Sequence, residues 1–454
     1  MRLTSSIKWV VALGTVGLLG FSTPAFSEPD LEAGKAAYEA NCARCHGPTG
    51  AGDGLDAKRM VPKPRKLSEG IFKFRTTASG TPPTDEDLFR TLSTGLPGSR
   101  MPDFQRLTEE TRWNLIAYIK GLSPVFKDQK PELIDLGKDP GSKQVNLAKG
   151  KEIYAQLGCA SCHGPAGRGN GPSAPTLVDS WGNPIQAANL TQGWNYRGGS
   201  GVRDIVARML AGIDGTPMPS YADAVSSKED AWQLAYYVHS LQEPPRWTRT
   251  VEAVKTAGSF PASPEDPKWQ GIPRTDPRLS STFYSQGEIQ PASVHAISVQ
   301  AMYNEEGILL RLSWQDPNES RESPPDALAL FLLQDRRLKF QVGSLRSWPA
   351  SHDAPNLDLC YWSAKSAAAR EAVASDTASL EGNQEAGQML ESSASYSDGV
   401  WRLLIKRPLQ SLISGGVTLS AQKPILIGIG VWNGGNGEQD RRRANSNWVD
   451  LVLK

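Results

Sequence analysis

The sequence is poor in cysteine and carries almost no net charge. It has five cysteines in 454 residues, and 48 acidic side chains balance 49 basic ones, which leaves a net charge of +1. Four of the cysteines belong to two short motifs, so no intramolecular disulfide framework is available and Cys360 is expected to be a buried apolar thiol. The near-neutral charge gives no indication of a nucleic-acid partner or of an acidic membrane surface.

Long hydrophobic runs are also missing. An apolar stretch near the start, Trp9 to Phe21, is too short to span a bilayer comfortably, and no later stretch approaches spanning length. Ala25-Phe26-Ser27 then offers the small residues at which a signal peptidase cuts. We expect residues 1–27 to be a secretory signal peptide and the mature chain to be a soluble periplasmic protein. An uncleaved N-terminal membrane tether is the alternative.

Two copies of one motif stand out against this background. They are Cys42-Ala43-Arg44-Cys45-His46 and Cys159-Ala160-Ser161-Cys162-His163. C-x-x-C-H is the attachment signature of c-type haem, in which each thiol adds to a haem vinyl group and the histidine ligates the iron. Zinc is disfavoured because histidine follows each cysteine pair at once and no second ligand pair is present. The sequence therefore predicts two covalent haems c.

The distal ligands follow from the same repeat. Met101 lies 55 residues after His46, and Met218 lies 55 residues after His163. Each methionine stands in a glycine-rich loop and precedes a proline. A thioether is a soft, neutral donor that favours reduced iron. We predict that His46 with Met101, and His163 with Met218, are the axial ligands; the alternative is that the methionines fill gaps in a core.

The repeat extends beyond the ligands. Gly34 and Tyr38 precede the first motif as Gly150 and Tyr154 precede the second, and an amphipathic segment with a tryptophan and a tyrosine follows each methionine. A helix before the haem motif and another after the methionine, packed through a glycine and an aromatic residue, resemble the class I cytochrome c fold. The resemblance implies two all-α domains.

One smaller match carries a predicted role. Phe74-Arg75 and Tyr196-Arg197 each precede a methionine loop. A guanidinium can bind a haem propionate through a bidentate fork, so Arg75 and Arg197 are candidate cofactor-binding residues. An ordinary surface arginine is an equally weighted alternative.

The last part of the chain changes in character. Helical periodicity gives way to alternation of apolar and polar residues, as in 297–303 and 308–314. Short alternating segments separated by turn signals indicate an antiparallel β-sandwich. The segment 363–391, rich in Ala, Ser and Glu, is instead expected to form a helix or a mobile insertion.

These observations divide the chain into six parts. They are a signal peptide (1–27), a first cytochrome c domain (28–127), a linker (128–145), a second cytochrome c domain (146–243), a second linker (244–277) and the sandwich (278–454).

Scattered aromatic residues and glycines in 270–454 carry a second resemblance. They include Trp362-Ser363-Ala364, Gly399-Val400-Trp401 and Val431-Trp432-Asn433-Gly434. The pattern resembles the haem-binding gamma subunit of ethylbenzene dehydrogenase and of related type II members of the dimethyl sulfoxide reductase group, such as the gamma-like subunit of nitrite oxidoreductase. The resemblance implies a β-sandwich that holds a non-covalent haem b between a methionine and a lysine.

The ligands of that haem do not carry over. Val342 fills the methionine's place, and valine cannot bind iron. Lys423 precedes a strand, while Arg443 stands where the family often shows a basic residue, and arginine keeps its proton. A third haem, non-covalent haem b, therefore stays an open alternative, as does a docking module without haem. The substitute ligands would be Met302, His295 and His352.

The ligand sets favour electron transfer over catalysis. Two six-coordinate His/Met haems leave no open iron position for a substrate, and no catalytic residue stands out. The resemblance implies a molybdenum and iron–sulfur enzyme as one redox partner. We expect a cytochrome or oxidase as the acceptor, and the direction of electron flow stays open. Two alternatives remain: a peroxidase-like or nitrite-reducing haem enzyme, and a ligand-binding sandwich fused to cytochromes.

Overall fold

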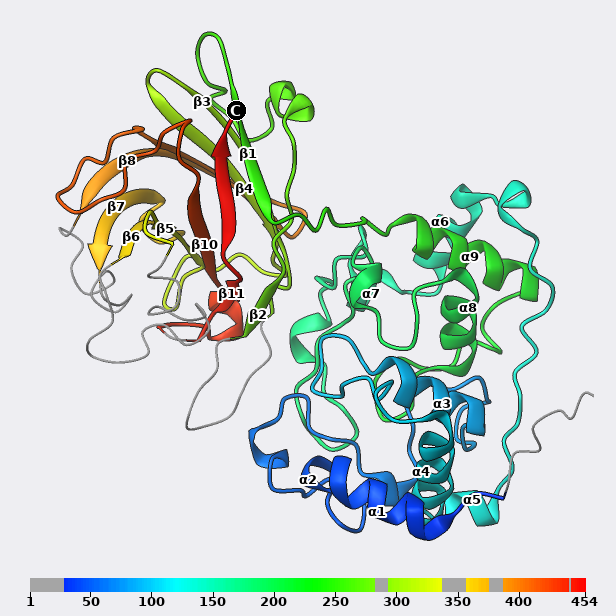
Figure 1. The fold of residues 1–454 in the computed structure, drawn as a ribbon. Helices are drawn as coiled ribbons and strands as arrows, with labels where there is room; N and C mark the ends of the chain where they lie inside the picture. The colour runs from blue at the N-terminus through cyan, green and yellow to red at the C-terminus, as the bar shows by residue number, and fades with distance from the viewer. Residues whose placement is uncertain (1–27, 282–292, 337–356, 375–386, 441) are drawn as a thin grey trace, which may run out of the picture.

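The computed structural model describes residues 28–281, 293–336, 357–374, 387–440 and 442–454. Helices form one lobe and strands form the other, and an extended segment joins them (Figure 1). The predicted signal peptide, 1–27, lies outside the described residues. Within the described ranges, no helix combines the length and the apolar composition that a membrane span requires.

The helical lobe consists of two units with the same plan. The helices described in the first are α1 (Leu31–Asn41), α2 (Ala43–His46), α3 (Asp85–Thr94), α4 (Glu109–Gly121) and α5 (Val125–Asp128). Those described in the second are α6 (Leu147–Gln156), α7 (Ala160–His163), α8 (Val202–Ala211) and α9 (Lys228–Ser240).

Each unit is built on one close helix crossing. A Cβ placed on Gly34 of α1 would overlap the backbone oxygen of Asn114 in α4. In the second unit, a Cβ on Gly150 of α6 would overlap the backbone oxygen of Gln233 in α9. Both glycines are needed because the two backbones touch, and an aromatic side chain completes each crossing. The helix packing expected from the repeat is confirmed.

The β lobe is one sheet that closes on itself. Its described strands are β1 (Thr250–Lys255), β2 (Leu279–Ser281), β3 (Ile297–Asn304), β4 (Gly307–Gln315), β5 (Ala327–Leu333), β6 (Leu357–Ser363), β7 (Ala368–Ala374), β8 (Gln388–Ser397), β9 (Val400–Arg407), β10 (Ile425–Trp432), β11 (Ala444–Ser446) and β12 (Val449–Leu453). Among them, β12 pairs with both β1 and β10, so ten strands form a ring. The predicted fold class, two cytochrome domains followed by a largely antiparallel sandwich or barrel, is confirmed.

The ring encloses an aromatic and aliphatic core. The rings of Trp314, Trp362 and Trp401 lie within 6.2 Å of one another, and all three side chains are buried. Cys360 on β6 is fully buried in the same cluster, as expected. Strand alternation thus places one face of each strand inward, which is the pattern that predicted the sandwich.

Two regions differ from the sequence-based expectation. The segment 363–391 was expected to be a helix or an insertion, but its described parts contain β7 and the start of β8. That prediction was wrong because pairing of β7 with β6 and the buried ion pair between Glu371 and Arg407 outweigh the helix-favouring composition. The predicted linker 244–277 also contributes β1, which pairs in parallel with β3 and β12.

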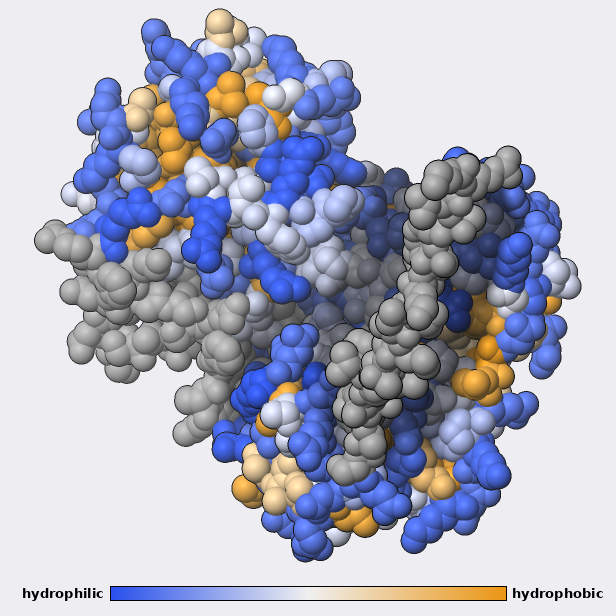
Figure 2. Space-filling view, turned by 45° about the vertical axis from the view of Figure 1, so that its right-hand side comes forward, coloured by the Kyte–Doolittle hydropathy of each residue, from blue (hydrophilic) through white to orange (hydrophobic). Residues whose placement is uncertain are grey.

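The surfaces of both lobes are mainly hydrophilic on the face that Figure 2 shows, with hydrophobic residues in small patches. At the junction of the lobes, Trp194 of the second helical unit meets Trp247 edge to face, with ring centroids 5.0 Å apart. The guanidinium of Arg278, from the β lobe, lies over both rings. Aromatic and cation–π contacts therefore join the second helical unit to the sheet.

Candidate haem sites and the contacts between them

The two C-x-x-C-H motifs fold as matching single-turn helices. Cys42 begins the turn of α2 and His46 ends it, while Cys159 and His163 do the same for α7. Residues three apart lie on one face of a helix, so each cysteine pair points to the same side. All four thiols are free of disulfide bonds, which leaves them available for thioether links.

Each motif histidine is held by a backbone carbonyl. His46 Nδ1 lies 2.8 Å from the oxygen of Arg65, and His163 Nδ1 lies 2.8 Å from the oxygen of Ala188. A carbonyl only accepts, so Nδ1 carries the proton and Nε2 is the atom left to bind a metal. Burial lowers the pKa of both imidazoles, which favours the neutral form that a metal ligand requires.

A tyrosine fixes the exit of each motif. Tyr38 donates its hydroxyl proton to the oxygen of Gly47 at 2.7 Å, and Tyr154 donates to the oxygen of Gly164 at 2.7 Å. Both tyrosines are buried; Tyr38 lies on α1, which crosses α4, and Tyr154 lies on α6, which crosses α9. The hydrogen bond therefore ties the residue after each histidine to the helix crossing.

The two methionine loops, Gly95–Pro102 and Gly212–Pro219, have the same internal hydrogen bonds. The backbone N–H of Leu96 donates to the oxygen of Met101, and that of Ile213 donates to the oxygen of Met218, both at 3.0 Å. Each methionine is half-buried and packs against the core of its own unit.

These donors fit haem c in both units. Two free thiols, a neutral imidazole with Nε2 uncommitted and a thioether recur in the same order and on the same scaffold. Cys42, Cys45, His46 and Met101 would hold one haem, and Cys159, Cys162, His163 and Met218 the other. The axial ligation itself stays a prediction.

Arg75 and Arg197 reach across the boundary between the two units. Arg75, which is fully buried, donates to the oxygen of Ala211 at 3.0 Å and pairs with Asp214 in the second methionine loop at 2.8 Å. Arg197 donates to the oxygens of Pro97 and Gly98 in the first methionine loop, at 3.2 and 3.0 Å. Each unit thus holds the other's methionine loop. Propionate binding by either arginine stays a prediction.

A second contact joins the proximal side of the first unit to the second unit. The guanidinium of Arg65 lies 4.3 Å from the ring centroid of Trp181, whose indole N–H donates to Glu69 at 2.7 Å. Burial lowers the pKa of Arg65 to about 10, so it stays charged at neutral pH. The residue whose carbonyl accepts from His46 is therefore fixed by its neighbour domain.

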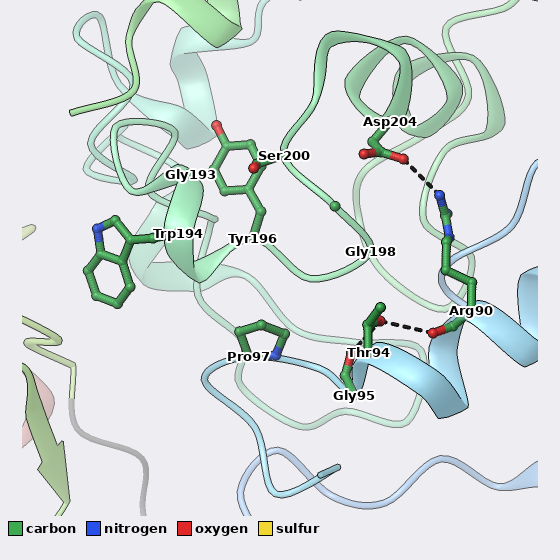
Figure 3. A pocket seen from close by; sticks show the side chains of 11 residues that line it. Arg90, Thr94, Gly95, Pro97, Gly193, Trp194, Tyr196, Gly198, Ser200 and Asp204 are labelled. Carbon is green, nitrogen blue, oxygen red and sulfur yellow. Dashed lines mark hydrogen bonds and ion pairs between the residues drawn. The ribbon is translucent and has the colours of Figure 1, made fainter. Parts of the chain in front are cut away.

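A pocket of about 380 Å³ lies beside this boundary (Figure 3). Gly95 and Pro97 of the first methionine loop line one side, and Trp194 and Tyr196 line the other. Its two charged side chains, Arg90 and Asp204, pair with each other at 2.7 Å. The two charges of the pocket therefore pair with each other across the boundary between the units.

Among the candidate ligands of a third haem, Met302 and Arg443 pack in different clusters, and two other named positions lie outside the described residues. Val342 and His352 lie outside those residues. Arg443 is buried, donates to Asn445 Oδ1 at 2.7 Å and lies over the ring of Trp432. Met302 is buried in a cluster with Trp269, whereas Lys423 is exposed. No comparison supports haem b here.

Sequence reasoning found the side chains that would bind haem and missed those that hold them. Arg65 and Ala188 act through backbone oxygens, which leave no side-chain signal. Asp214 stands in a motif loop that was recognised, but its partner across the boundary is set by the docking of the two units.

Comparison with known proteins agrees with two cytochrome c domains in this part of the chain. Residues 29–119 match the family model described as cytochrome c oxidase, cbb3-type, subunit III, and residues 147–242 match the model described as cytochrome c. The chain is 27% identical to the cbb3-type cytochrome c oxidase subunit FixP of Sinorhizobium medicae, over 51% of this chain and 67% of that protein. It is 24% identical to the chlorate reductase subunit gamma of Ideonella dechloratans, over 44% of this chain and 82% of that protein.

A solved structure is similar as well. The chain is 42% identical to one chain of a structure titled as the Kuenenia stuttgartiensis reducing HAO-like protein complex. The match covers 48% of this chain and all of that one, with a TM-score of 0.45.

Proposed function

Because residues 29–119 and 147–242 are two cytochrome c domains, we propose that this chain is a periplasmic electron-transfer subunit in which two covalent haems form a relay. One observation carries the proposal: Arg75 and Arg197 each bind the other domain's methionine loop. The exchange keeps the two loops on a shared boundary, and a relay needs a fixed distance between its two redox sites.

The chain's own residues supply the remaining requirements. Each haem, when bound, supplies a one-electron iron couple. His46 and His163 present an uncommitted Nε2 because a carbonyl holds the other ring nitrogen, and Met101 and Met218 would supply a second protein ligand to each iron. With both positions filled by protein, an electron can pass without substrate binding at iron.

We propose that the β lobe is a docking module related to the ethylbenzene dehydrogenase gamma subunit, and that its partner is a molybdenum and iron–sulfur enzyme. Two observations support the docking module: the sheet is closed, and the guanidinium of Arg443 is already hydrogen-bonded to Asn445. The presence of a chlorate reductase gamma subunit among the relatives supports the partner. The second partner would be a cytochrome or an oxidase, in line with the oxidase subunits among the relatives.

Haem counting on the purified full chain tests the proposal. A pyridine haemochrome spectrum taken before and after acid-acetone extraction should give two haems c per chain and no extractable haem. Both should be low-spin, and the reduced protein should not bind carbon monoxide rapidly. Fewer than two covalent haems would refute the relay, and fast carbon monoxide binding would favour a haem enzyme.

A further inference from the structure

The loop that holds the proximal histidine of the second cytochrome domain also meets the β lobe. Ala188 accepts the Nδ1 proton of His163 at 2.8 Å. The next residue, Asn189, donates from its side-chain amide to Gln315 Oε1. Gln315 is the last residue of β4, so a single residue step separates the histidine's partner from a contact with the sheet.

Both ends of the Gln315 amide are used by this loop. Its Oε1 also accepts from Gln192 Nε2 at 2.9 Å, and its Nε2 donates to Thr191 Oγ1 at 2.8 Å. Thr191 in turn donates to Asn189 Oδ1 at 2.8 Å. The four side chains form a closed hydrogen-bonded cluster, and Thr191 and Gln192 are buried within it. Buried amides of this kind are costly to leave unpaired.

The sheet gives Gln315 a fixed origin. Its backbone pairs with Val400 on β9, and its neighbours Trp314 and Asp316 are fully buried. A side chain that extends from a rigid, packed strand can hold a loop more firmly than a side chain from another loop can.

The first cytochrome domain has a different arrangement at the equivalent place. Its acceptor residue, Arg65, stacks on Trp181 of the second cytochrome domain. The contacts described for Gln315 go to the loop Asn189–Gln192 of the second domain alone. The described contacts of Gln315 therefore reach the second predicted haem site and not the first.

We propose that Gln315 is a positioning residue for the proximal ligand of the second haem. The inference rests on the proposed function, since it concerns the haem that His163 would bind. Gln315 holds Asn189–Gln192 so that the Ala188 carbonyl stays in line with His163 Nδ1. A well-formed hydrogen bond at Nδ1 makes the imidazole a stronger donor, which stabilises oxidised iron and lowers the reduction potential. Docking of the β lobe thus tunes the second haem.

The test is a redox titration of the full chain carrying Gln315→Leu. Leucine keeps most of the volume and removes both hydrogen-bonding ends. The equilibrium constant for reducing the second haem should rise about threefold to tenfold, which is about 28–59 mV for one electron. The first haem should not change. Met101→His, which alters only the first site, assigns the two potentials.

Two further variants complete the test. Gln388→Leu is the matched control, because Gln388 is exposed at the start of β8, where its backbone pairs with Glu371 of β7. Thr191→Val breaks the cluster from the cytochrome side and should also raise the reduction potential of the second haem. It therefore tests the proposal independently if Gln315→Leu does not fold. Near-infrared and paramagnetic resonance spectra of the second haem should shift with its potential.

The outcomes separate this inference from the proposed function. Two covalent haems with unchanged potentials in both Gln315→Leu and Thr191→Val overturn the inference alone. Equal shifts of both haems overturn it too, because they indicate general loosening. Fewer than two covalent haems in the parent chain refute the proposed function before either variant is made.

Discussion

The two cytochrome domains have the same internal arrangement but contact different neighbours. Both have a helix crossing at a glycine, a tyrosine bonded to the residue after the motif, and a histidine held by a carbonyl 2.8 Å away. Yet the first domain's acceptor residue, Arg65, stacks on the second domain, whereas the residue after the second domain's acceptor, Asn189, bonds to the β lobe. The comparison teaches that one haem scaffold can be given two environments through docking contacts alone.

The largest expected effect comes from the distal ligands. Met101→Ala and Met218→Ala should each convert one haem to a high-spin form and lower its potential, because the thioether favours reduced iron. A shift on the order of 0.1–0.3 V lies within the range of about 0.8 V that axial ligands span. Optical spectra and redox titration measure both effects. Met209→Ala, in the buried core of α8, is the control and should leave both haems low-spin. Low-spin spectra in both ligand variants would contradict the assignment.

The next effect tests whether the helix crossings are equivalent. Alanine at Gly34 or Gly150 should gain about 1 kcal/mol of helix propensity. It should nevertheless destabilise its own domain by about 3 kcal/mol, because the added methyl overlaps backbone that cannot move cheaply. Thermal unfolding, followed at each haem, measures the loss.

The control for the crossings is Gly121→Ala at the end of α4, where an added methyl meets open space. It should be neutral or slightly stabilising. A loss confined to one of the two crossing glycines would show that the domains differ inside as well as outside.

Features that arise from neighbouring residues could be predicted from the sequence, whereas contacts between residues far apart in the chain could not. The ligand motifs, the glycine and tyrosine repeat and most strands are local patterns, and the fold class followed from them. Strand β7 was missed because its stability comes from pairing and from Glu371 meeting Arg407, which lies 36 residues away. The partners of Arg75 and Gln315 depend on domain docking, and backbone acceptors such as Ala188 carry no residue signal.

The boundary arginines should give unequal effects. Arg75→Met removes a fully buried guanidinium together with its pair to Asp214, and should cost about 2–4 kcal/mol of domain docking. Arg197→Met removes two hydrogen bonds to carbonyls, and should cost about 1–2 kcal/mol. Limited proteolysis between the domains and the coupling of the two unfolding transitions measure both.

The control is Arg90→Met, which breaks a half-exposed pair with Asp204 at the same boundary and should cost less than about 1 kcal/mol. If Arg75→Met and Arg90→Met reduce the free energy of domain docking equally, burial does not determine the strength of these contacts.

The smallest effect sharpens the comparison most, because it asks for equality. Tyr38→Phe and Tyr154→Phe each remove one buried hydroxyl that donates at 2.7 Å to the residue after the histidine. Each should destabilise its own domain by about 1 kcal/mol, since one carbonyl loses its partner while the ring still packs. Tyr236→Phe, whose hydroxyl bonds to Asp139 at an exposed site, is the control and should have little effect. If the losses of stability in Tyr38→Phe and Tyr154→Phe differ by more than the loss in Tyr236→Phe, then docking to the β lobe also affects the interior packing of the second domain.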